Sequence, residues 1–436
     1  MGDIYAAAYV TIIAAVGCDP EHGLPGVKPG SRGKIKSLIM DKVRLSILPA
    51  LQNLRDVSKS AWVTRGWTFQ EGFLSRRRLI FCTNQVVFVC NSQMYHESEN
   101  ADFQGEHNAW RPGWLPSTAH EEDALSRAMS CLDTYTRRTL SFEGDSLNAI
   151  VGALNTFRTE SVYHIWGVPF LGAEHQSTAT TETEILTSGL ALFWSHEWRC
   201  TRRRDFPSWS PVGWEGEIYW LNTRTGSHTR LMADLRAIVV VTPDSEHNMY
   251  SLGTSQKELP EVSRFIYVSV RSAPLRLTAS DTTPGYPLDD EAHSTDSEEL
   301  DSIGILIPFD DELQVIIDVM WDVLPSQFKA GELIKGVLIP RVIGAKEERR
   351  DQGECILLLE RHGQHYERIG VIIIPQEPWS KESYLCRTVE RVPIVCGRNS
   401  MPLGEGDELT TVKERIHATD FWWRQTFTND ETIILG

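Results

Sequence analysis

The pattern of apolar and polar positions in the first 95 residues predicts a mixed helix and strand structure. Residues 9–15 are rich in β-branched residues and almost continuously apolar, which predicts a strand buried on both faces after a helix end at residues 1–8. From Ser60 onward, apolar residues at positions 62, 66, 69 and 73 form one face of a single helix, with Ser60 as its N-cap. Apolar runs at 79–82 and 86–90 then predict a hairpin.

Later parts of the chain follow two other patterns. Residues 97–123 are polar and interrupted by proline, and two helical patterns follow at about 122–137 and 145–158. After residue 230, seven apolar runs separated by polar turns predict a β-rich domain of antiparallel type. We therefore expect three regions: residues 1–95, a linker and helical middle region over 96–230, and a β-rich domain over 231–436.

The chain has a negative net charge, and its charged residues are unevenly distributed along the sequence. With 43 basic and 59 acidic side chains the net charge is −16, which argues against a protein built to coat nucleic acid or an anionic membrane. Residues 277–328 contain 13 acidic side chains and no basic one, and a solvated, disordered acidic loop at about 279–302 explains them more simply than an acidic functional surface. The first 100 residues have the opposite charge balance, with 12 basic and 8 acidic side chains.

Cysteine usage and apolar run lengths indicate a cytoplasmic protein. The eight cysteines are scattered without a CxxC pair, and no N-x-S/T sequon occurs, so we expect free thiols in a reducing compartment. The longest apolar run, residues 4–16, is shorter than the roughly 20 residues that a membrane span requires. We expect no membrane span.

Motifs for common cofactors and metals are absent from the sequence. The glycine-rich segment 17–34 lacks the spacing of a phosphate-binding loop, and neither GxGxxG nor GxSxG occurs. His362 and His365 form an HxxH pair, but they lie in a turn without a nearby cysteine or carboxylate pair. We expect no metal site and no bound cofactor.

The segment WVTRGWTFQEGFLSRRRLIF, residues 62–81, contains the most informative candidate, Glu71. This carboxylate lies in an otherwise apolar, aromatic helix and is expected to be partly buried, so it must find a donor or raise its pKa. One interpretation is an ion pair with Arg65 or Arg78 that stabilises the helix. The other is catalysis by a pocket carboxylate.

Four stretches resemble the fungal heterokaryon incompatibility (HET) domain proteins. They are MGDIYAAAYVTIIAAVGCDPEHGLPG, WVTRGWTFQEGFLSRRRLIFCTNQVVFVC, GDSLNAIVGALNTF and RRRDFPSWSPVGWEG, of which RGWTFQE followed by LSRR is the specific part. The motif residues that we single out are Trp62, Arg65, Gly66, Trp67, Gln70, Arg76, Arg77, Trp209 and Trp214. We expect the aromatic run Phe206, Trp209, Trp214 and Trp220 to be structural and to hold the middle region against the N-terminal part.

The resemblance implies that the first part of the domain is missing. Family members usually begin with blocks like YxALSYxWG and WIDxLCIxQ, and the helix of the second block runs into the pattern with which this chain starts. The chain is therefore expected to be N-terminally truncated. Its α/β remnant would be an incomplete parallel sheet of TIR or flavodoxin-like type, with an open edge at the strand of residues 9–15.

The resemblance also implies a function in self/non-self recognition, fungal innate immunity and programmed cell death. The leading expectation is an interaction module that binds a protein partner or a paralogue and is non-catalytic in this form. The alternative comes from a more distant resemblance to TIR domains, in which Trp67 and Glu71 match a W-x-x-x-E motif. Glu71 would then be the catalytic residue of an NAD glycohydrolase, with NAD as the substrate. The sequence leaves the oligomeric state open.

Overall fold

A computed structural model describes a large part of the chain. The described residues are 2–17, 19–32, 37–41, 43–46, 57–91, 93–97, 124–172, 194–196, 200–220, 229–232, 237–241, 245–248, 261–280, 302–308, 313–322, 331–339, 341–344, 353–375, 395–396 and 426–436.

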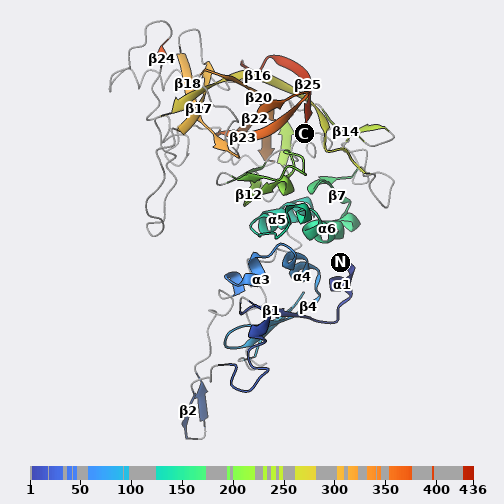
Figure 1. The fold of residues 1–436 in the computed structure, drawn as a ribbon, viewed down its shortest axis with the longest axis vertical. Coiled ribbons are helices and arrows are strands. Elements are labelled where there is room, and N and C mark those ends of the chain that lie inside the picture. The colour runs from blue at the N-terminus through green and yellow to red at the C-terminus, as the bar shows by residue number, and fades with distance from the viewer. Residues whose placement is uncertain are drawn as a thin grey trace. The chain divides into compact units, whose positions relative to one another are not determined.

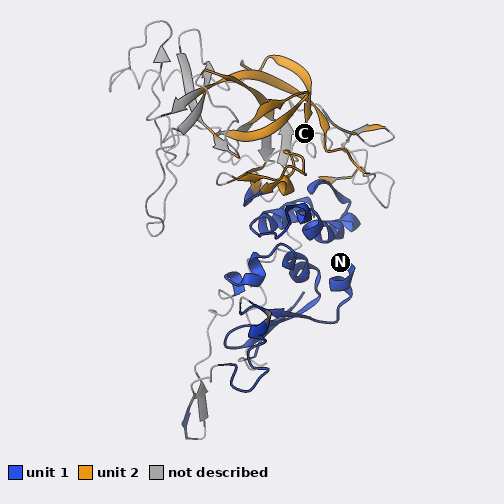
Figure 2. Cartoon of the chain, in the orientation of Figure 1, with its two compact units in different colours: residues 1–169, 215–218 blue, residues 170–214, 219–436 orange. Residues whose placement is uncertain are grey.

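The chain forms two compact units (Figure 2). Unit 1 contains residues 1–169 and 215–218, and unit 2 contains residues 170–214 and 219–436. These units divide the chain at other places than the three regions expected from the sequence, and those regional limits stay a prediction.

A four-stranded mixed sheet is the centre of the N-terminal part of unit 1 (Figure 1). Its strands are β1 (Thr11–Ala14), β4 (Arg77–Phe81), β5 (Val86–Cys90) and β6 (Met94–His96), in the order β1-β4-β5-β6. The expected strand and the expected hairpin of β4 and β5 are both confirmed. The sheet is mixed and not parallel throughout, because β1 runs parallel to β4 while β5 and β6 each pair antiparallel with the preceding strand.

Strand β1 lies at an open edge of this sheet. Among the described residues it pairs with β4 and with no other strand, as expected. The prediction that both of its faces are buried was wrong: Ile13 is 1% exposed, but Ile12 is 58% and the preceding Tyr9 is 81% exposed. One face therefore joins the core, whereas the other contacts solvent because no described element covers it.

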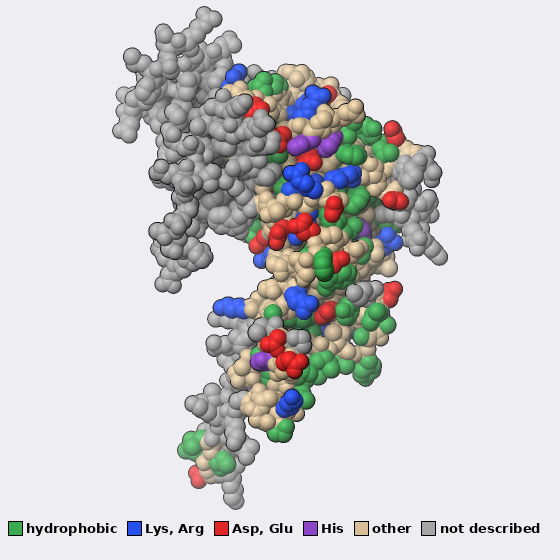
Figure 3. Space-filling model, viewed as in Figure 1, with side chains coloured by type: hydrophobic (Ala, Val, Ile, Leu, Met, Phe, Trp, Pro, Cys, Tyr) green, Lys and Arg blue, Asp and Glu red, His purple; other side chains and the backbone are tan. Residues whose placement is uncertain are grey.

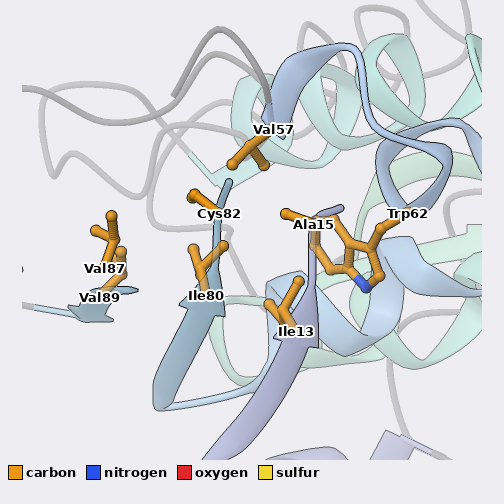
Figure 4. Packing of buried hydrophobic residues seen from close by; sticks show 8 residues of the cluster. All are labelled: Ile13, Ala15, Val57, Trp62, Ile80, Cys82, Val87 and Val89. Atoms are coloured by element: carbon orange, nitrogen blue, oxygen red, sulfur yellow. The ribbon is translucent and has the colours of Figure 1, made fainter. Parts of the chain in front are cut away.

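The buried face of the sheet packs against α3 (Ala61–Thr64) and the turn before it (Figure 4). The cluster takes Ile13 and Ala15 from β1 and its end, and Trp62 from α3. Its members are Ile13, Ala15, Val57, Trp62, Ile80, Cys82, Val87 and Val89. Alternate strand positions thus supply a continuous apolar layer beneath the helix that carries the family motif.

The helices of unit 1 form where the sequence pattern predicts them, with one exception described below. They are α1 (Gly2–Ala7), α3, α4 (Thr68–Leu74), α5 (Ala124–Thr136) and α6 (Asn148–Asn155). Aromatic contacts join α4 to the later helices: Phe69 packs edge-on against Tyr135 at 5.8 Å between ring centroids, and Phe73 contacts Phe157 at 6.2 Å. The N-terminal part therefore depends on α5 and on the 3-10 helix η5 (Thr156–Glu160) after α6 for its core.

Short elements complete the part of the chain before residue 232. The 3-10 helices are η1 (Pro20–His22), η4 (Glu143–Asp145), η5 (Thr156–Glu160) and η7 (Pro211–Gly213). The short strands form four pairs: β2 (Ser37–Met40) with β3 (Val43–Ser46), β7 (Val162–Ile165) with β8 (Val168–Leu171), β9 (Trp194–His196) with β12 (Ile218–Trp220), and β10 (Thr201–Arg202) with β11 (Trp214–Glu215).

An eleven-stranded sheet dominates unit 2, which confirms the expected β-rich C-terminal region. Its centre is β16 (Ile266–Ser280), which pairs antiparallel with four other strands. The others are β14 (Ala237–Val241), β15 (Glu246–Asn248), β17 (Ser302–Pro308), β18 (Leu313–Asp318), β19 (Met320–Trp321), β20 (Leu333–Ile339), β22 (Gly353–His362), β23 (His365–Pro375), β24 (Val395–Cys396) and β25 (Asn429–Leu435). A separate pair joins β13 (Thr229–Met232) to β21 (Arg341–Gly344). The acidic loop expected at about 279–302 lies outside the described residues, except for its two ends in β16 and β17.

A buried charged network lies inside unit 2. Asp322 accepts hydrogen bonds from Arg368 Nε at 2.6 Å and from His196 Nδ1 at 2.8 Å, and all three side chains are at most 1% exposed. The Arg368 guanidinium also lies 3.5 Å from the centre of the Trp194 ring and donates to the Trp194 carbonyl. The network thereby joins β9, β23 and the residue after β19.

Residues 1–95 expressed alone are expected to be insoluble or dimeric. The fragment keeps the open edge of β1 and loses Tyr135 and Phe157, the ring partners of Phe69 and Phe73. Size-exclusion chromatography and sedimentation measure this, with residues 1–172 as the comparison fragment that retains both partners. A monomeric 1–95 fragment with a cooperative melting transition would contradict the expectation.

Candidate functional site

The family motif is placed on two short helices and not on one. The sequence pattern predicted a single helix from Ser60, but α3 ends at Thr64 and α4 begins at Thr68. Arg65 between them is extended, with φ −84° and ψ 134°. The expected N-cap is confirmed, because the Ser60 hydroxyl accepts a hydrogen bond from the backbone of Val63 at 3.3 Å.

A long-range backbone pairing breaks the helix at Gly66. The N–H of Gly66 donates to the carbonyl of Thr139 at 2.8 Å, and the N–H of Thr139 donates to Thr64 at 2.6 Å. A Cβ at position 66 would lie 2.4 Å from Cδ2 of Leu140, so any other residue here would require the Leu140 side chain to shift. The hydroxyl of Thr68 donates to the Arg65 carbonyl at 2.6 Å and fixes the start of α4.

Glu71 lies half-buried on α4 and binds two donors of its own chain. The Tyr5 hydroxyl donates to Oε1 at 3.2 Å, and the Trp62 indole Nε1 donates to Oε2 at 3.0 Å. Both carboxylate oxygens are therefore engaged, one by α1 and one by α3. The cost of partly burying Tyr5 raises the pKa of its phenol, and the nearby Glu71 charge raises it further.

The ion pairs that the sequence suggested for Glu71 are not the contacts that hold it. The side chain of Arg65 is exposed. Arg78 is buried and donates instead to the carbonyls of Gly72 and, at 3.4 Å, of Phe73. It thus satisfies carbonyls at the C-terminal end of α4, where a cation also complements the helix dipole.

Arg138 is a buried cation that the charge of Glu71 affects, and the sequence did not reveal it. Its guanidinium lies 5.1 Å from the centre of the Phe69 ring and donates to the Thr68 hydroxyl at 3.0 Å. Burial lowers the pKa of Arg138 to about 10, while the charge of Glu71 acts in the opposite direction. The two charges therefore interact, although no direct hydrogen bond joins them among the described contacts.

The other motif residues of this segment have separate tasks. Trp67, the N-cap of α4, donates from Nε1 to the Asp145 carboxylate of η4 at 3.1 Å, and the buried Gln70 of α4 donates to the Asn148 carbonyl at the start of α6 at 2.8 Å. Arg76 is exposed. Arg77 lies 5.0 Å from the centre of the Tyr9 ring, next to the edge strand. The motif is thus mostly a set of packing and hydrogen-bonding positions.

Trp209 and Trp214 belong to unit 2, whereas Glu71 belongs to unit 1. They are 1% and 0% exposed, which fits the structural role expected for them. Trp209 Nε1 donates to the Arg264 carbonyl at 3.0 Å, and Trp214 Nε1 donates to the Ser208 carbonyl at 2.8 Å. Their hydrogen bonds therefore stabilise unit 2 itself. Attachment to the N-terminal part remains a prediction.

Metal ligands do not come together in the described part of the chain. No three His, Cys, Asp or Glu side chains form a cluster there. The HxxH pair lies at the turn between β22 and β23, where His362 contacts Glu360 at 3.2 Å and His365 lies 3.6 Å from Glu367. No helix in the described ranges has both the length and the apolar composition of a membrane crossing.

The N-terminal part of the chain matches a known family. Residues 1–71 match the family model described as Heterokaryon incompatibility protein (HET). The resemblance to the HET family is confirmed for this segment. No curated protein and no solved structure matches the chain.

This HET segment, residues 1–71, contains both donors to Glu71 and ends at Glu71 itself. The opening pattern around Tyr5 is part of the family resemblance, but nothing in the sequence links Tyr5 to Glu71. Arg138 lies outside the segment, and nothing in its local sequence marks it. Chemically, the arrangement is a carboxylate that fastens α1 and α3 to α4.

Proposed function

We propose that this chain acts in fungal heterokaryon incompatibility as a non-catalytic protein-recognition module. In this proposal it takes part in self/non-self recognition and programmed cell death by binding a protein partner or a paralogue. The HET match over residues 1–71 supports the biological setting. The non-catalytic role rests on a single observation, the occupation of both Glu71 oxygens by Tyr5 and Trp62.

The argument from Glu71 concerns what the carboxylate already does. A catalytic carboxylate must present at least one oxygen to the substrate, within about 2.6–3.2 Å of the atom on which it acts. Here Oε1 and Oε2 each accept a hydrogen bond from a side chain on a different helix. A substrate would have to share an oxygen that already accepts a hydrogen bond from α1 or α3, so the contacts support a structural carboxylate.

Replacing Glu71 with glutamine is expected to lower the stability of unit 1 and to leave cell killing intact. The amide loses the charge and turns an N–H₂ group towards one of the two donors, which we expect to cost about 1–2 kcal/mol of unfolding free energy. Thermal melting of the purified chain measures the first effect. Survival of fungal cells that express the wild-type chain or the variant measures the second.

A control variant and a measurement of cellular NAD separate this proposal from NAD cleavage. Tyr5→Phe is the matched control, because it removes the donor to Oε1 and keeps the carboxylate, so it should destabilise unit 1 to a similar or smaller extent. Cellular NAD should be the same in wild-type, Glu71→Gln and Tyr5→Phe strains. NAD that falls with the wild-type chain and recovers with a folded Glu71→Gln variant would overturn the proposal in favour of an NAD glycohydrolase.

A further inference from the structure

Strand β1 directs backbone hydrogen-bonding groups out of the open edge of its sheet in unit 1. The N–H of Ala15, just after the strand, donates to the carbonyl of Phe81 at 3.1 Å, so Ala15 turns its backbone groups towards β4. These groups alternate in direction along a strand, so those of Ile12 and Ala14 point away from β4. In the described ranges no other strand pairs with β1. The edge can therefore accept a further strand.

The side chains at this edge are apolar and exposed. Ile12 is 58% exposed, Val10 before it is 38% exposed, and Ile4 on α1 is 68% exposed. Figure 3 shows hydrophobic side chains gathered on unit 1 around α1 and the segment that leads into β1. Natural proteins protect free edge strands with charged side chains or proline, and residues 9–15 contain neither. Such an edge is typical of an interaction surface.

Opposite charges lie at the two ends of β1. At the N-terminal end, the guanidinium of Arg77 lies 5.0 Å from the centre of the Tyr9 ring. At the C-terminal end, η1 contains the exposed Glu21, and its His22 packs against Gly17, so η1 lies directly after the strand. Neither Arg77 nor Glu21 forms an ion pair with another described residue. The strand is therefore positive at one end and negative at the other.

We propose that β1 pairs antiparallel with β1 of a second copy of this chain, about a two-fold axis through the two Ile12 residues. The outward backbone groups of Ile12 then bond to those of the same residue in the second copy, and Ala14 lies opposite Val10. Directly opposed residues share a face of the sheet, so the two exposed Ile12 side chains contact and bury each other. The two-fold pairing is self-complementary and closes after two copies.

Charge selects a second copy in antiparallel orientation as the occupant of the edge. In that orientation the N-terminal end of each β1 lies beside the C-terminal end of the other, so Arg77 of each copy lies near Glu21 of the other. Parallel pairing would bring like charges together at both ends. The net charge of −16 makes two copies repel at long range, but salt at about 0.15 M screens charges that are more than about 8 Å apart. The local attraction therefore decides the pairing.

Sedimentation equilibrium of the full chain at about 0.15 M salt tests the proposal. We expect a monomer–dimer equilibrium with a dissociation constant of about 1–100 µM, because the interface is small. Ile12→Lys places two like charges on the axis and should raise this constant about 100-fold or more. Phe142→Ser is the matched control, because Phe142 belongs to unit 1 and is 74% exposed, and its replacement should leave the constant unchanged.

Reversal of the end charges gives a second test. Arg77→Glu or Glu21→Lys alone brings like charges together at both ends of the pair and should raise the dissociation constant about fivefold. Both changes in one chain restore opposite charges across the axis and should return the constant to within about twofold of the wild type. A role of Arg77 within its own copy, against Tyr9, would not be recovered by a change at Glu21.

Three results would overturn the proposal. The first is a wild-type chain that stays monomeric up to about 300 µM, which would leave the edge to a different protein. The second is a dimer that Ile12→Lys retains in full. The third is a double charge reversal that pairs no better than the two single variants. Equal melting temperatures would show that lost pairing does not reflect unfolding, and the charge reversals decide if Ile12→Lys melts early.

The pairing names a second copy as the partner of the recognition module, and in that respect it rests on the proposed function. The two proposals can fail separately. Sedimentation of the purified chain measures the pairing, whereas cellular NAD and the survival of fungal cells measure the function. A dimer that forms as expected in a chain that cleaves NAD would retain the pairing and remove the non-catalytic function.

Discussion

Replacing Arg368 with methionine is expected to lower the free energy of unfolding of unit 2 by about 3–5 kcal/mol, the usual cost of leaving one buried charge without its partner. Asp322 would remain fully buried with only the hydrogen bond from His196. Methionine fills part of the space of the arginine stem against Trp194 but lacks the donors to Asp322 and to the Trp194 carbonyl. Denaturant unfolding followed by tryptophan fluorescence measures the loss.

The matched control removes both charges. Asp322→Asn combined with Arg368→Met keeps an acceptor for His196 and no longer buries a lone charge, so it should be more stable than Arg368→Met alone. A double variant that is less stable than the single one would contradict this account.

Lowering the pH should destabilise unit 2 through the same network of Asp322, Arg368 and His196. Burial would raise the pKa of Asp322, but the Arg368 guanidinium and the hydrogen bond from His196 outweigh it and lower that pKa below its ordinary value. The stabilisation is therefore complete above the unfolded pKa of aspartate, about 3.9, and is lost as the pH falls through the lowered folded value. Unfolding curves recorded between neutral pH and pH about 2 should show this loss in the wild type and less of it in Arg368→Met.

Replacing Trp209 with alanine should cost about 3–5 kcal/mol, as large aromatic truncations in protein cores do. The side chain is 1% exposed, and its indole N–H donates to the Arg264 carbonyl, so the variant leaves both a cavity and a carbonyl without its donor. Trp209→Phe retains most of the ring and should lose less. Phe142→Ala, at a position 74% exposed, should change stability by about 0.5 kcal/mol or less. A melting temperature that Trp209→Ala leaves unchanged would refute the structural role.

The strands of unit 2 were predictable because their signal is local. Apolar runs such as residues 355–360 and 368–374 are bounded by polar turns, and β22 and β23 form over them as an antiparallel pair. In β1 the position of the strand was predicted correctly and its burial was not. Burial depends on whether elements pack on both faces, and the exposed side chain of Ile12 shows that no element in the described ranges covers one face of β1.

The site around Glu71 depends on contacts that sequence periodicity does not record. The apolar spacing from Trp62 to Phe73 continues through the break at Gly66, because the break is caused by pairing with Thr139 and not by a local helix-ending signal. The partly buried state of Glu71 was predictable from its aromatic neighbours. That Tyr5 is its donor was not predictable, because Tyr5 lies 66 positions away and helix or strand spacing relates only neighbouring positions.

The chain passes between its two units three times, because residues 215–218 belong to unit 1 while the segments on either side of them belong to unit 2. The backbone N–H of Ile218 donates to the Thr136 hydroxyl at 3.1 Å, and this hydrogen bond attaches the segment 215–218 to α5. A single genetic exchange anywhere from residue 170 to residue 218 would therefore separate a piece of one unit from the rest of it. The two units are therefore not interchangeable cassettes, because a swap of a whole unit would need three coordinated breakpoints, one at each passage of the chain between the units.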